Sequence, residues 1–407
     1  MADTYSIESK VVIREFDEDR DVKVVGKLER NCTEINGTTK KGFSIFTNMM
    51  SNGDPLSRIR FYPLHVMLVA EMVESKELVG VVKGCIKSVQ TPSGSLFKMG
   101  CILGLRVSPI HRRKGVGLKL VTSIEEWMLT NGADYAFLAT EKNNNASKNL
   151  FTNKCNYFNF TSLIIFLHPP TSFPTNHISK KDVKIDKISI DQAISFYTRI
   201  LKTKELYPLD MDIILKEKLS LGTWVSYYKD EGFKLNIEDI ITHKSTTSSS
   251  WIIFSLWNTC EACDNNLQVK TKLFQPLRFL HATLNHAKDK ICPCLRMFDS
   301  MCNNSTFGFL FLYGLHGEGE NLGGLMESIW RFTSRLGEKL KECRVVITEL
   351  GFGDPLVNHV PKIDSMSCID DMWYTKRLGN HSDDENDELV EVMKRQLGNV
   401  FVDPRDF

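Results

Sequence analysis

Residues 99–132 constrain the fold more than any other stretch of the chain. The apolar run Cys101–Val107 predicts a buried strand, and the segment 109–117 then interrupts it with three consecutive cations and two glycines. A helix is predicted next, because apolar residues recur on one stripe: Val116, Leu120, Ile124 and Met128. Amides at a helix start lack partners and the helix dipole is positive there, so a strand, a glycine turn and a helix in this order predict a phosphate site.

Two common phosphate motifs do not fit this turn. A P-loop requires Lys-Ser or Lys-Thr directly after its last glycine, whereas Leu118 and Lys119 follow Gly117. A dinucleotide-binding turn would carry a third glycine where Leu120 stands, and it rarely contains three cations. The sequence therefore favours another kind of phosphate-bearing ligand.

The spacing Arg112-x-x-Gly115-x-Gly117 resembles the coenzyme A pyrophosphate loop of the GNAT acyltransferases. Residues 11–167 resemble that family throughout, and the whole chain is similar to the plant Hookless-type N-acetyltransferases, a family implicated in the differential growth of seedlings. The resemblance implies an α/β (α+β) fold, with a mixed central sheet of GNAT type and flanking helices. It also implies acetyl-CoA as cosubstrate, transfer of an acetyl group to an amine, and a nuclear location, with a cytoplasmic one as the alternative.

The resemblance places coenzyme A along the loop and the strand before it. Amides from Arg113 to Leu118 would hold the pyrophosphate, and the neighbouring cations would add charge-assisted contacts. The pantetheine arm would lie beside the end of the strand, where an N–H near Val107 would stabilise the oxyanion formed on attack. The expected cofactor-binding residues are Leu105, Val107, Arg112, Arg113, Lys114, Gly115, Val116, Gly117, Leu118 and Asn144. Asn144 is equally well interpreted as a turn residue in its run of asparagines.

The general acid departs from the family pattern. GNAT enzymes commonly carry a tyrosine in the helix after the fifth strand, and the matching position here is Phe151, which has no proton to give. A shift of the alignment by one residue would place Thr152 there instead. The nearest phenol downstream is Tyr157, which is therefore the candidate acid.

The general base is open among three carboxylates. Glu71 and Glu74 lie on or after the second predicted strand, and Glu141 ends the fifth. Each is more simply an exposed surface carboxylate. The candidate catalytic residues are therefore Glu71, Glu141 and Tyr157. The reaction is direct attack by an amine, so no metal cofactor is required.

The proline-rich stretch after His168 predicts a domain boundary, because proline lacks a backbone donor and resists helix and interior strand. We expect a first domain over residues 1–168, a linker over 169–178, a second α/β domain over 179–379 and an acidic tail over 380–407. An acidic run such as 380–388 is usually solvated and disordered.

The second half repeats the order of strand, glycine turn, helix and strand, which suggests a degenerate copy of the first domain. Its turn carries Glu318 and Glu320 where the first carries cations. Carboxylates repel a pyrophosphate at close range, so the second copy is not expected to bind coenzyme A.

Four cysteines have a spacing seen in zinc sites: Cys260, Cys263, Cys292 and Cys294. Buried thiols are the simpler interpretation. The chain carries eleven cysteines without the spacing of a disulfide scaffold, and no apolar segment follows Met1, so we expect an intracellular protein with reduced thiols.

The net charge of +1 gives no support for a nucleic-acid or membrane partner, since basic residues are scattered outside the loop. The expected partners are acetyl-CoA and an amine acceptor, either a protein lysine or a small amine. The oligomeric state is left open. The favoured function is therefore an acetyl-CoA-dependent N-acetyltransferase. The alternative is a protein of the same fold that binds acetyl-CoA, or keeps only the fold, without turnover.

Overall fold

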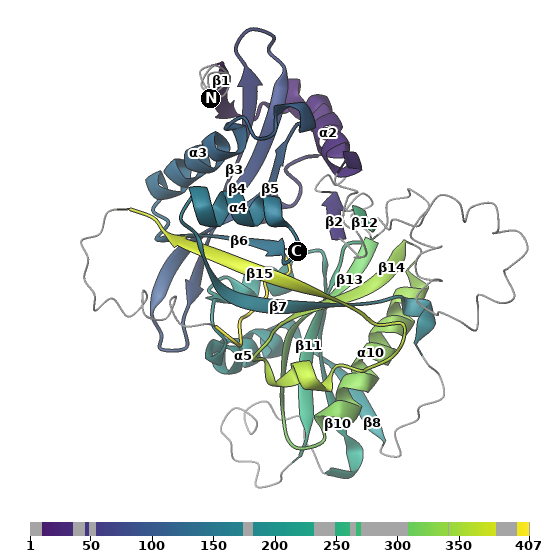
Figure 1. The fold of residues 1–407 in the computed structure, drawn as a ribbon. Helices are drawn as coiled ribbons and strands as arrows, with labels where there is room; N and C mark the ends of the chain where they lie inside the picture. Colours follow the sequence, from purple (N-terminus) through teal and green to yellow (C-terminus); the bar gives the residue numbers. More distant parts are fainter. Residues whose placement is uncertain are drawn as a thin grey trace, which may run out of the picture.

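The computed structural model describes residues 10–35, 45–48, 54–173, 182–231, 249–260, 266–269, 308–340, 342–379 and 397–406 (Figure 1). In chain order the elements are β1 (Val11–Glu15), α2 (Glu18–Ile35), β2 (Ile45–Asn48), η1 (Ile59–Phe61), β3 (Leu64–Met72), β4 (Leu78–Gln90), β5 (Leu96–Val107), η2 (Pro109–His111), α3 (Val116–Thr130), β6 (Tyr135–Glu141), α4 (Asn145–Lys154), β7 (Phe158–His168), η3 (Pro170–Ser172), β8 (Val183–Ile188), α5 (Ile190–Ile200), η4 (Leu201–Thr203), β9 (Tyr207–Pro208), α6 (Met211–Lys216), β10 (Ser220–Tyr228), η5 (Lys229–Glu231), β11 (Trp251–Asn258), β12 (Asn266–Val269), β13 (Gly308–Glu318), α10 (Leu322–Lys339), β14 (Cys343–Gly351), η7 (Pro355–His359) and β15 (Ser367–Arg377). Among these described residues, no helix is long and apolar enough to cross a bilayer.

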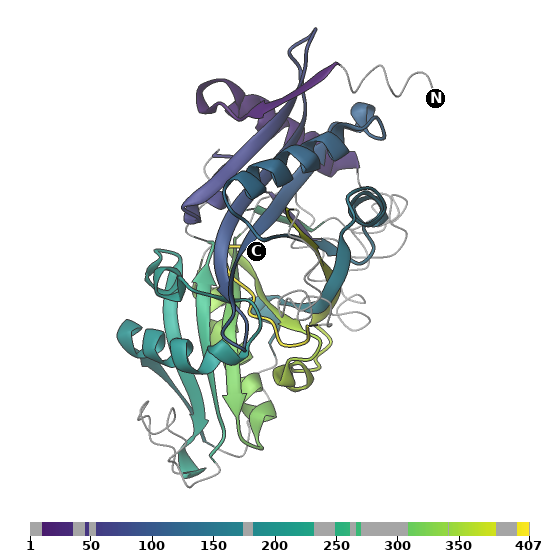
Figure 2. The same cartoon turned by 90° about the vertical axis from the view of Figure 1, so that its left-hand side faces the viewer.

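A single mixed sheet runs through the whole molecule. Its strand order is β1-β3-β4-β5-β6-β15-β7-β14-β13-β11-β10-β8, and β9 pairs with β4. The β5–β6 and β13–β14 pairs are parallel, whereas the other pairs in this sheet are antiparallel. Figure 2 shows this sheet strongly bent between the strands of the first half and those of the second. The predicted fold class, a mixed sheet with flanking helices and a second copy of the motif, is confirmed.

The two halves repeat one arrangement. The first contains β4, β5, α3 and β6, and the second contains β11, β13, α10 and β14 in the same order. In each half, the antiparallel pair before the helix has a shift in register beside a glycine in the left-handed region. The glycine is Gly104, with φ +59°, in the β4–β5 pair, and Gly314, with φ +63°, in the β11–β13 pair. The halves then exchange their last strands, since β15 pairs with β6, β7 pairs with β14, and β7 and β15 pair with each other. The boundary at 169–178 stays a prediction, and one sheet contains strands from both sides of it.

Helix α3 packs very closely on the sheet. All four residues of its predicted apolar stripe are buried, and Gly80, Gly84 and Gly100 lie beneath them. A Cβ atom at Gly84 would be 2.8 Å from Ile124 Cδ1, and one at Gly100 would be 2.5 Å from Met128 Sδ. On the opposite face, Val81 packs with residues of α2. The glycines therefore set how near α3, and the loop before it, can approach β4 and β5.

We expect Gly84→Val to lower the free energy of unfolding by about 2–3 kcal/mol, because two methyl groups must displace Ile124 in a packed core. Urea denaturation followed by circular dichroism measures this. Gly94→Ala is the comparison, because a Cβ atom at this open position would meet only Gln90 Nε2 at 3.7 Å, while φ is +96°. Its loss of unfolding free energy should be smaller and should report backbone strain alone. A Gly84 variant as stable as the wild type would show that α3 is not held at this distance.

The end of the chain is part of the core. Residues 397–406 are described, and the apolar side chains of Leu397, Val400, Phe401 and Val402 are buried. Single bridges join Thr161 to Leu397 and Glu205 to Val400, so this segment contacts both halves. The predicted acidic tail over 380–407 is wrong for these residues, because burial of the apolar run outweighs the charge of the preceding segment. The acidic run 380–388 lies outside the described residues.

His168 ends β7 in the interior, where its Nε2 lies 2.9 Å from Ser365 Oγ. Burial lowers its pKa to about 4. The ordinary pKa of histidine is about 6.5, so between about pH 4 and pH 6.5 the unfolded chain binds a proton at His168 that the folded chain does not. We therefore expect the free energy of unfolding to fall by up to about 3 kcal/mol as the pH drops from 6.5 to 4. Denaturation of wild type and His168→Gln at both pH values measures this, and an equal fall in the two proteins would contradict it.

Candidate functional site

The strands β5 and β6 separate after a short stretch of pairing. Their parallel pairing covers only Met99–Cys101 and Tyr135–Phe137, although β5 continues to Val107 and β6 to Glu141. The register between β4 and β5 shifts between Val81 and Lys83, next to the left-handed Gly104. We call the opening between residues 102–107 of β5 and residues 138–141 of β6 the splay, and the Cys101–Phe137 pair its apex.

The backbone of β5 directs polar groups into the splay. Ser108 N–H bonds Val79 O at 2.8 Å, and Val107 is paired with Gly80. Because hydrogen bonding alternates along an antiparallel pair, the N–H and C=O of Val107 point away from β4, as do those of Leu105. The carbonyl of Val107 accepts from Arg112 Nε at 3.1 Å, which confirms that it faces outward. The amides of Leu105 and Val107 are thus presented to the opening.

The loop after β5 presents a second set of amides. Gly115 has φ +82° and caps α3, which begins at Val116, and Arg113 has φ +60°. The first bond of this helix runs from Lys119 N to Gly115 O at 3.0 Å. Within the described part of the chain, no acceptor bonds the amides of residues 113–118. This is the geometry of an anion site, in which successive bare N–H groups meet the positive end of a helix.

The cations of the loop differ in what they do. Arg112 is half-buried and holds the Val107 carbonyl, so it fixes the loop against the end of β5. Arg113 is exposed and Lys114 is half-buried, and neither forms an ion pair with any residue that the structure describes. Both side chains therefore remain available to a bound phosphate. The predicted loop residues, 112–118, and the strand residues Leu105 and Val107 come together at one end of the splay.

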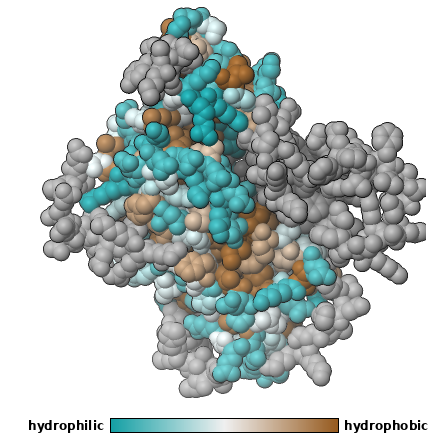
Figure 3. Space-filling model, viewed as in Figure 1, coloured by the Kyte–Doolittle hydropathy of each residue, from teal (hydrophilic) through white to brown (hydrophobic). Residues whose placement is uncertain are grey.

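Helix α4 packs against the start of α3. Leu150 Cδ2 would lie 3.5 Å from a Cβ atom at Gly117, and Phe151 is buried. Asn144 caps α4, because its Oδ1 accepts from Ser147 N at 3.2 Å and its Nδ2 donates to Thr140 Oγ1 at 3.1 Å. Both ends of the Asn144 amide are thus used locally, as its interpretation as a turn residue predicts. The outer surface over α4 is mainly hydrophilic (Figure 3).

Tyr157 lies away from the splay. Its ring packs edge-on against Phe151 at 5.2 Å between centroids, and Lys376 Nζ lies 5.7 Å from its centroid. Burial and the nearby Glu125 raise its pKa well above the ordinary value. Glu125 follows Gly117 by eight residues, or roughly 12 Å along α3. The structure therefore places this phenol beneath the middle of α3 and not at its N-terminus.

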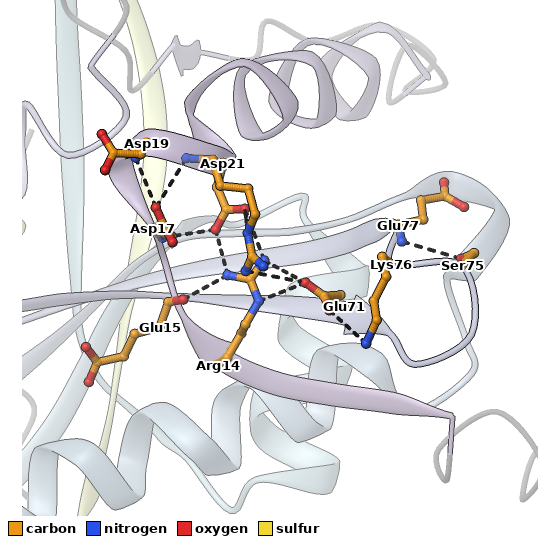
Figure 4. Close-up of polar contacts among 10 residues, drawn as sticks. Arg14, Glu15, Asp17, Asp19, Asp21, Glu71, Ser75, Lys76 and Glu77 are labelled. Carbon is orange, nitrogen blue, oxygen red and sulfur yellow. Dashed lines mark hydrogen bonds and ion pairs between the residues drawn. The ribbon is translucent and has the colours of Figure 1, made fainter.

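Glu71 is held in an ion-pair network on β3 (Figure 4). Arg14 Nη2 donates to Glu71 Oε2 at 2.7 Å, and Arg14 Nη1 donates to Asp21 Oδ2 at 2.6 Å. The hydrogen bond from Arg14 lowers the pKa of Glu71. Strand β4 lies between β3 and β5, so this carboxylate is separated from the splay. Glu74, the other candidate nearby, is exposed and pairs with Lys10 at 3.2 Å.

Glu141 stands at the open end of the splay, directly opposite Asp371 of β15. Asp371 is itself buried near the Glu349 carboxyl and accepts from Trp373 Nε1 at 3.2 Å. Burial raises the pKa of Asp371 to about 7 and that of Glu349 well above its ordinary value. Sequence reasoning missed this carboxyl pair, although two adjacent acids at 370–371 within an apolar strand pattern could have indicated it.

The equivalent place in the second half is already filled. Asn321 N, next to the start of α10, donates to Ser250 Oγ at 3.0 Å, and a Cβ atom at Gly319 would lie 2.5 Å from Ser250 Cα. Val400, Phe401 and Val402 line the small cavity where β13 and β14 separate. These contacts support the prediction that the second copy does not bind coenzyme A. Of the four cysteines with zinc-like spacing, Cys260 is buried beside Cys343, and the other three lie outside the described residues.

Comparison with known proteins decides the family. Residues 47–157 match the model of the Acetyltransferase (GNAT) family. The chain is also 36% identical to the "Probable N-acetyltransferase HLS1" of Arabidopsis thaliana, over 97% of this chain and all of that protein. The chain belongs to the GNAT acetyltransferase family. This GNAT-family transferase is also 30% identical to "Acetyl transferase GW6a" of Oryza sativa subsp. japonica, over 98% of this chain and 97% of that one.

A solved structure shares the architecture of this GNAT protein. The N-myristoyltransferase of Saccharomyces cerevisiae with bound myristoyl-CoA superposes with a TM-score of 0.51 at 11% identity, covering 97% of this chain and 86% of that one. At this identity the likeness concerns the fold alone. It agrees with the repeat of two GNAT-like halves in one sheet.

Proposed function

We propose that this protein transfers the acetyl group of acetyl-CoA to a primary amine. The observation that carries the proposal is a row of outward-facing amides, those of Leu105 and Val107 in the splay and those of residues 113–118 at the start of α3. The amides of Ser108, His111 and Arg112, which lie between these two groups, are bonded within the chain. A doubly phosphorylated group bound at the loop would continue as an amide-bearing arm along β5. Few other ligands combine these two features.

Each part of the row has a separate task in this proposal. The amides of residues 113–118 bind the pyrophosphate, and Arg113 and Lys114 add charge-assisted contacts. The edge of β5 bonds the pantetheine arm as if it were an added strand. The amide of Leu105 or Val107 donates to the thioester oxygen, where negative charge develops when the amine attacks. Arg112 keeps β5 and the loop in register by bonding the Val107 carbonyl.

The acceptor is proposed as a protein lysine or a small amine, because both supply a primary amine to the thioester. A role in plant growth and a nuclear location belong to the same proposal, and they rest on the likeness to plant relatives. A second candidate function is binding of acetyl-CoA without turnover. It is favoured by Phe151, which is buried where many GNAT enzymes carry a tyrosine, and by the position of Tyr157 beneath α3.

Two measurements on the purified protein separate these functions. Isothermal titration with acetyl-CoA tests binding, and a thiol-release assay with a panel of amines and lysine peptides tests turnover. Binding with amine-dependent release of free coenzyme A supports the transferase. Binding without release supports the second candidate, and absence of binding contradicts both.

A further inference from the structure

The last residues of the chain bring a carboxylate to the apex of the splay. Cys85 of β4 is paired directly with Cys101 of β5, which is the last residue of β5 to pair with β6. The sulfur atoms of Cys85 and Cys101 and a carboxylate oxygen of Asp406 all lie within 4.8 Å of one another. A residue some 300 positions away in the sequence thus lies at the apex of the splay, beside the strand along which the pantetheine arm is proposed to bind.

Two side chains orient this carboxylate. Tyr62 Oη donates to Asp406 Oδ1 at 2.5 Å, and Lys87 Nζ donates to Oδ2. Lys87 Nζ also lies 5.4 Å from the ring centroid of Phe137, the β6 residue at the apex. An ionised carboxylate offers about four lone-pair positions, so each oxygen of Asp406 keeps one for a substrate.

Asp406 is the member of its cluster that retains access to solvent. Its side chain is 9% exposed, against 5% for Lys87 and 1% for Asp403. Burial raises the pKa of the Cys101 thiol beside it well above its ordinary value, so this thiol stays protonated and cannot take up a proton. A divalent metal ion at the same three groups is disfavoured by the Lys87 ammonium already bonded to Asp406.

We propose that Asp406 is the general base that deprotonates the acceptor amine, and this rests on the function proposed above. The acceptor arrives as an ammonium ion and passes one proton to the Asp406 carboxylate, which becomes a neutral acid. The free amine then forms a C–N bond to the thioester carbon, and the C–S bond breaks. The leaving thiolate takes the second proton lost by nitrogen, which yields an amide and free coenzyme A.

The variant Asp406→Asn tests this role, because it keeps the size of the side chain but cannot accept the proton. We expect kcat to fall about 10²–10³-fold, with the affinity for acetyl-CoA unchanged. The matched control is Asp210→Asn, which removes another carboxylate bonded to the same segment, since Asp210 Oδ2 accepts from Arg405 at 2.6 Å. The control is expected to keep wild-type kcat at a temperature where both variants are folded.

The pH profile separates a base from a structural residue. Wild type should lose kcat/KM for the amine at low pH as the base becomes protonated, and this acidic limb should be absent from Asp406→Asn. The titratable and charged groups around Asp406 remain in the variant: Arg58, Tyr62, Cys85, Lys87, Cys101, Glu349, Asp403 and Arg405.

If Asp406→Asn does not fold, Asp406→Glu tests the role of Asp406 as the base, because it keeps the negative charge but moves the carboxylate by one methylene. A fall in kcat of at least tenfold, at unchanged acetyl-CoA affinity, supports the base. Wild-type kcat in either Asp406 variant overturns it while leaving the transferase function intact. A wild-type protein that releases no thiol with any amine overturns the function and the base together.

Discussion

Gly117→Glu is expected to weaken the binding of acetyl-CoA by about 10³-fold. A Cβ atom at Gly117 would meet only Leu150 Cδ2 at 3.5 Å and Val107 Cγ2 at 3.7 Å, which are ordinary contacts, so the fold accepts a side chain. The new carboxylate would stand among the amides of residues 113–118, close to the expected pyrophosphate. Two like charges about 4 Å apart near a protein surface repel by about 4 kcal/mol, which corresponds to this factor.

The stability of the Gly117→Glu protein should not fall, because an acidic residue in the first turn is favourable to the helix dipole. Gly117→Gln is the matched control, since it has the same size without the charge. We expect it to bind more tightly than the glutamate variant by at least tenfold. Calorimetric titration of the three proteins measures this, and a glutamate variant that binds within threefold of wild type would contradict the site.

Replacement of Arg405 by methionine is expected to lower the free energy of unfolding by about 3–5 kcal/mol. Arg405 is 1% exposed and forms ion pairs with Asp403 at 2.7 Å and Asp210 at 2.6 Å. Its guanidinium also lies 4.5 Å from the ring centroid of Tyr62. Burial opposes ionisation of Asp403, but Arg405 and Lys87 outweigh this and lower its pKa to about 2. Without the cation, buried carboxylates would be left incompletely paired.

An exposed ion pair provides the comparison for this variant. Lys229 pairs with Asp182 at 2.6 Å, with side chains 51% and 69% exposed, so Lys229→Met should cost less than about 1 kcal/mol. Urea denaturation at pH 7 measures both changes. A loss for Arg405→Met no larger than that for Lys229→Met would show that the segment 397–406 does not hold the two halves together.

The strand, loop and helix at residues 101–130 could be predicted because their signals are local. The apolar run, the two glycines and the stripe with helical spacing all act within a few residues of one another, and the structure has β5, the loop and α3 where expected. The direction of the Leu105 and Val107 amides follows from the alternation of a strand, whereas their proposed contact with the pantetheine arm came from the resemblance to the family.

The exchange of β7 and β15 could not be predicted in the same way. Both segments carry the apolar pattern of a strand, but the choice of partner depends on contacts between residues about 200 or more positions apart. The internal repeat in the sequence indicated two similar halves. It did not indicate that each half would take its neighbouring strand from the other.

The candidate catalytic residues show a similar limit. The positions of Glu71 and Tyr157 in the sequence make them candidates. In the structure, however, Arg14 binds the Glu71 carboxylate, and the middle of α3 covers Tyr157. Asp406 belongs to no motif, and the acidic run before it suggested a solvated tail. The apolar sequence at 400–402 was the available signal that the chain re-enters the core.

Hydrogen–deuterium exchange with and without acetyl-CoA tests the central claim most directly. The amides of residues 113–118 have no acceptor within the described chain, so they should exchange rapidly in the free protein. We expect saturating acetyl-CoA to protect these amides together with those of Leu105 and Val107, and to leave the turn at 319–321 unchanged. Protection confined to other parts of the chain, or none at all, would contradict the assignment of the splay and the start of α3 as the acyl-CoA site.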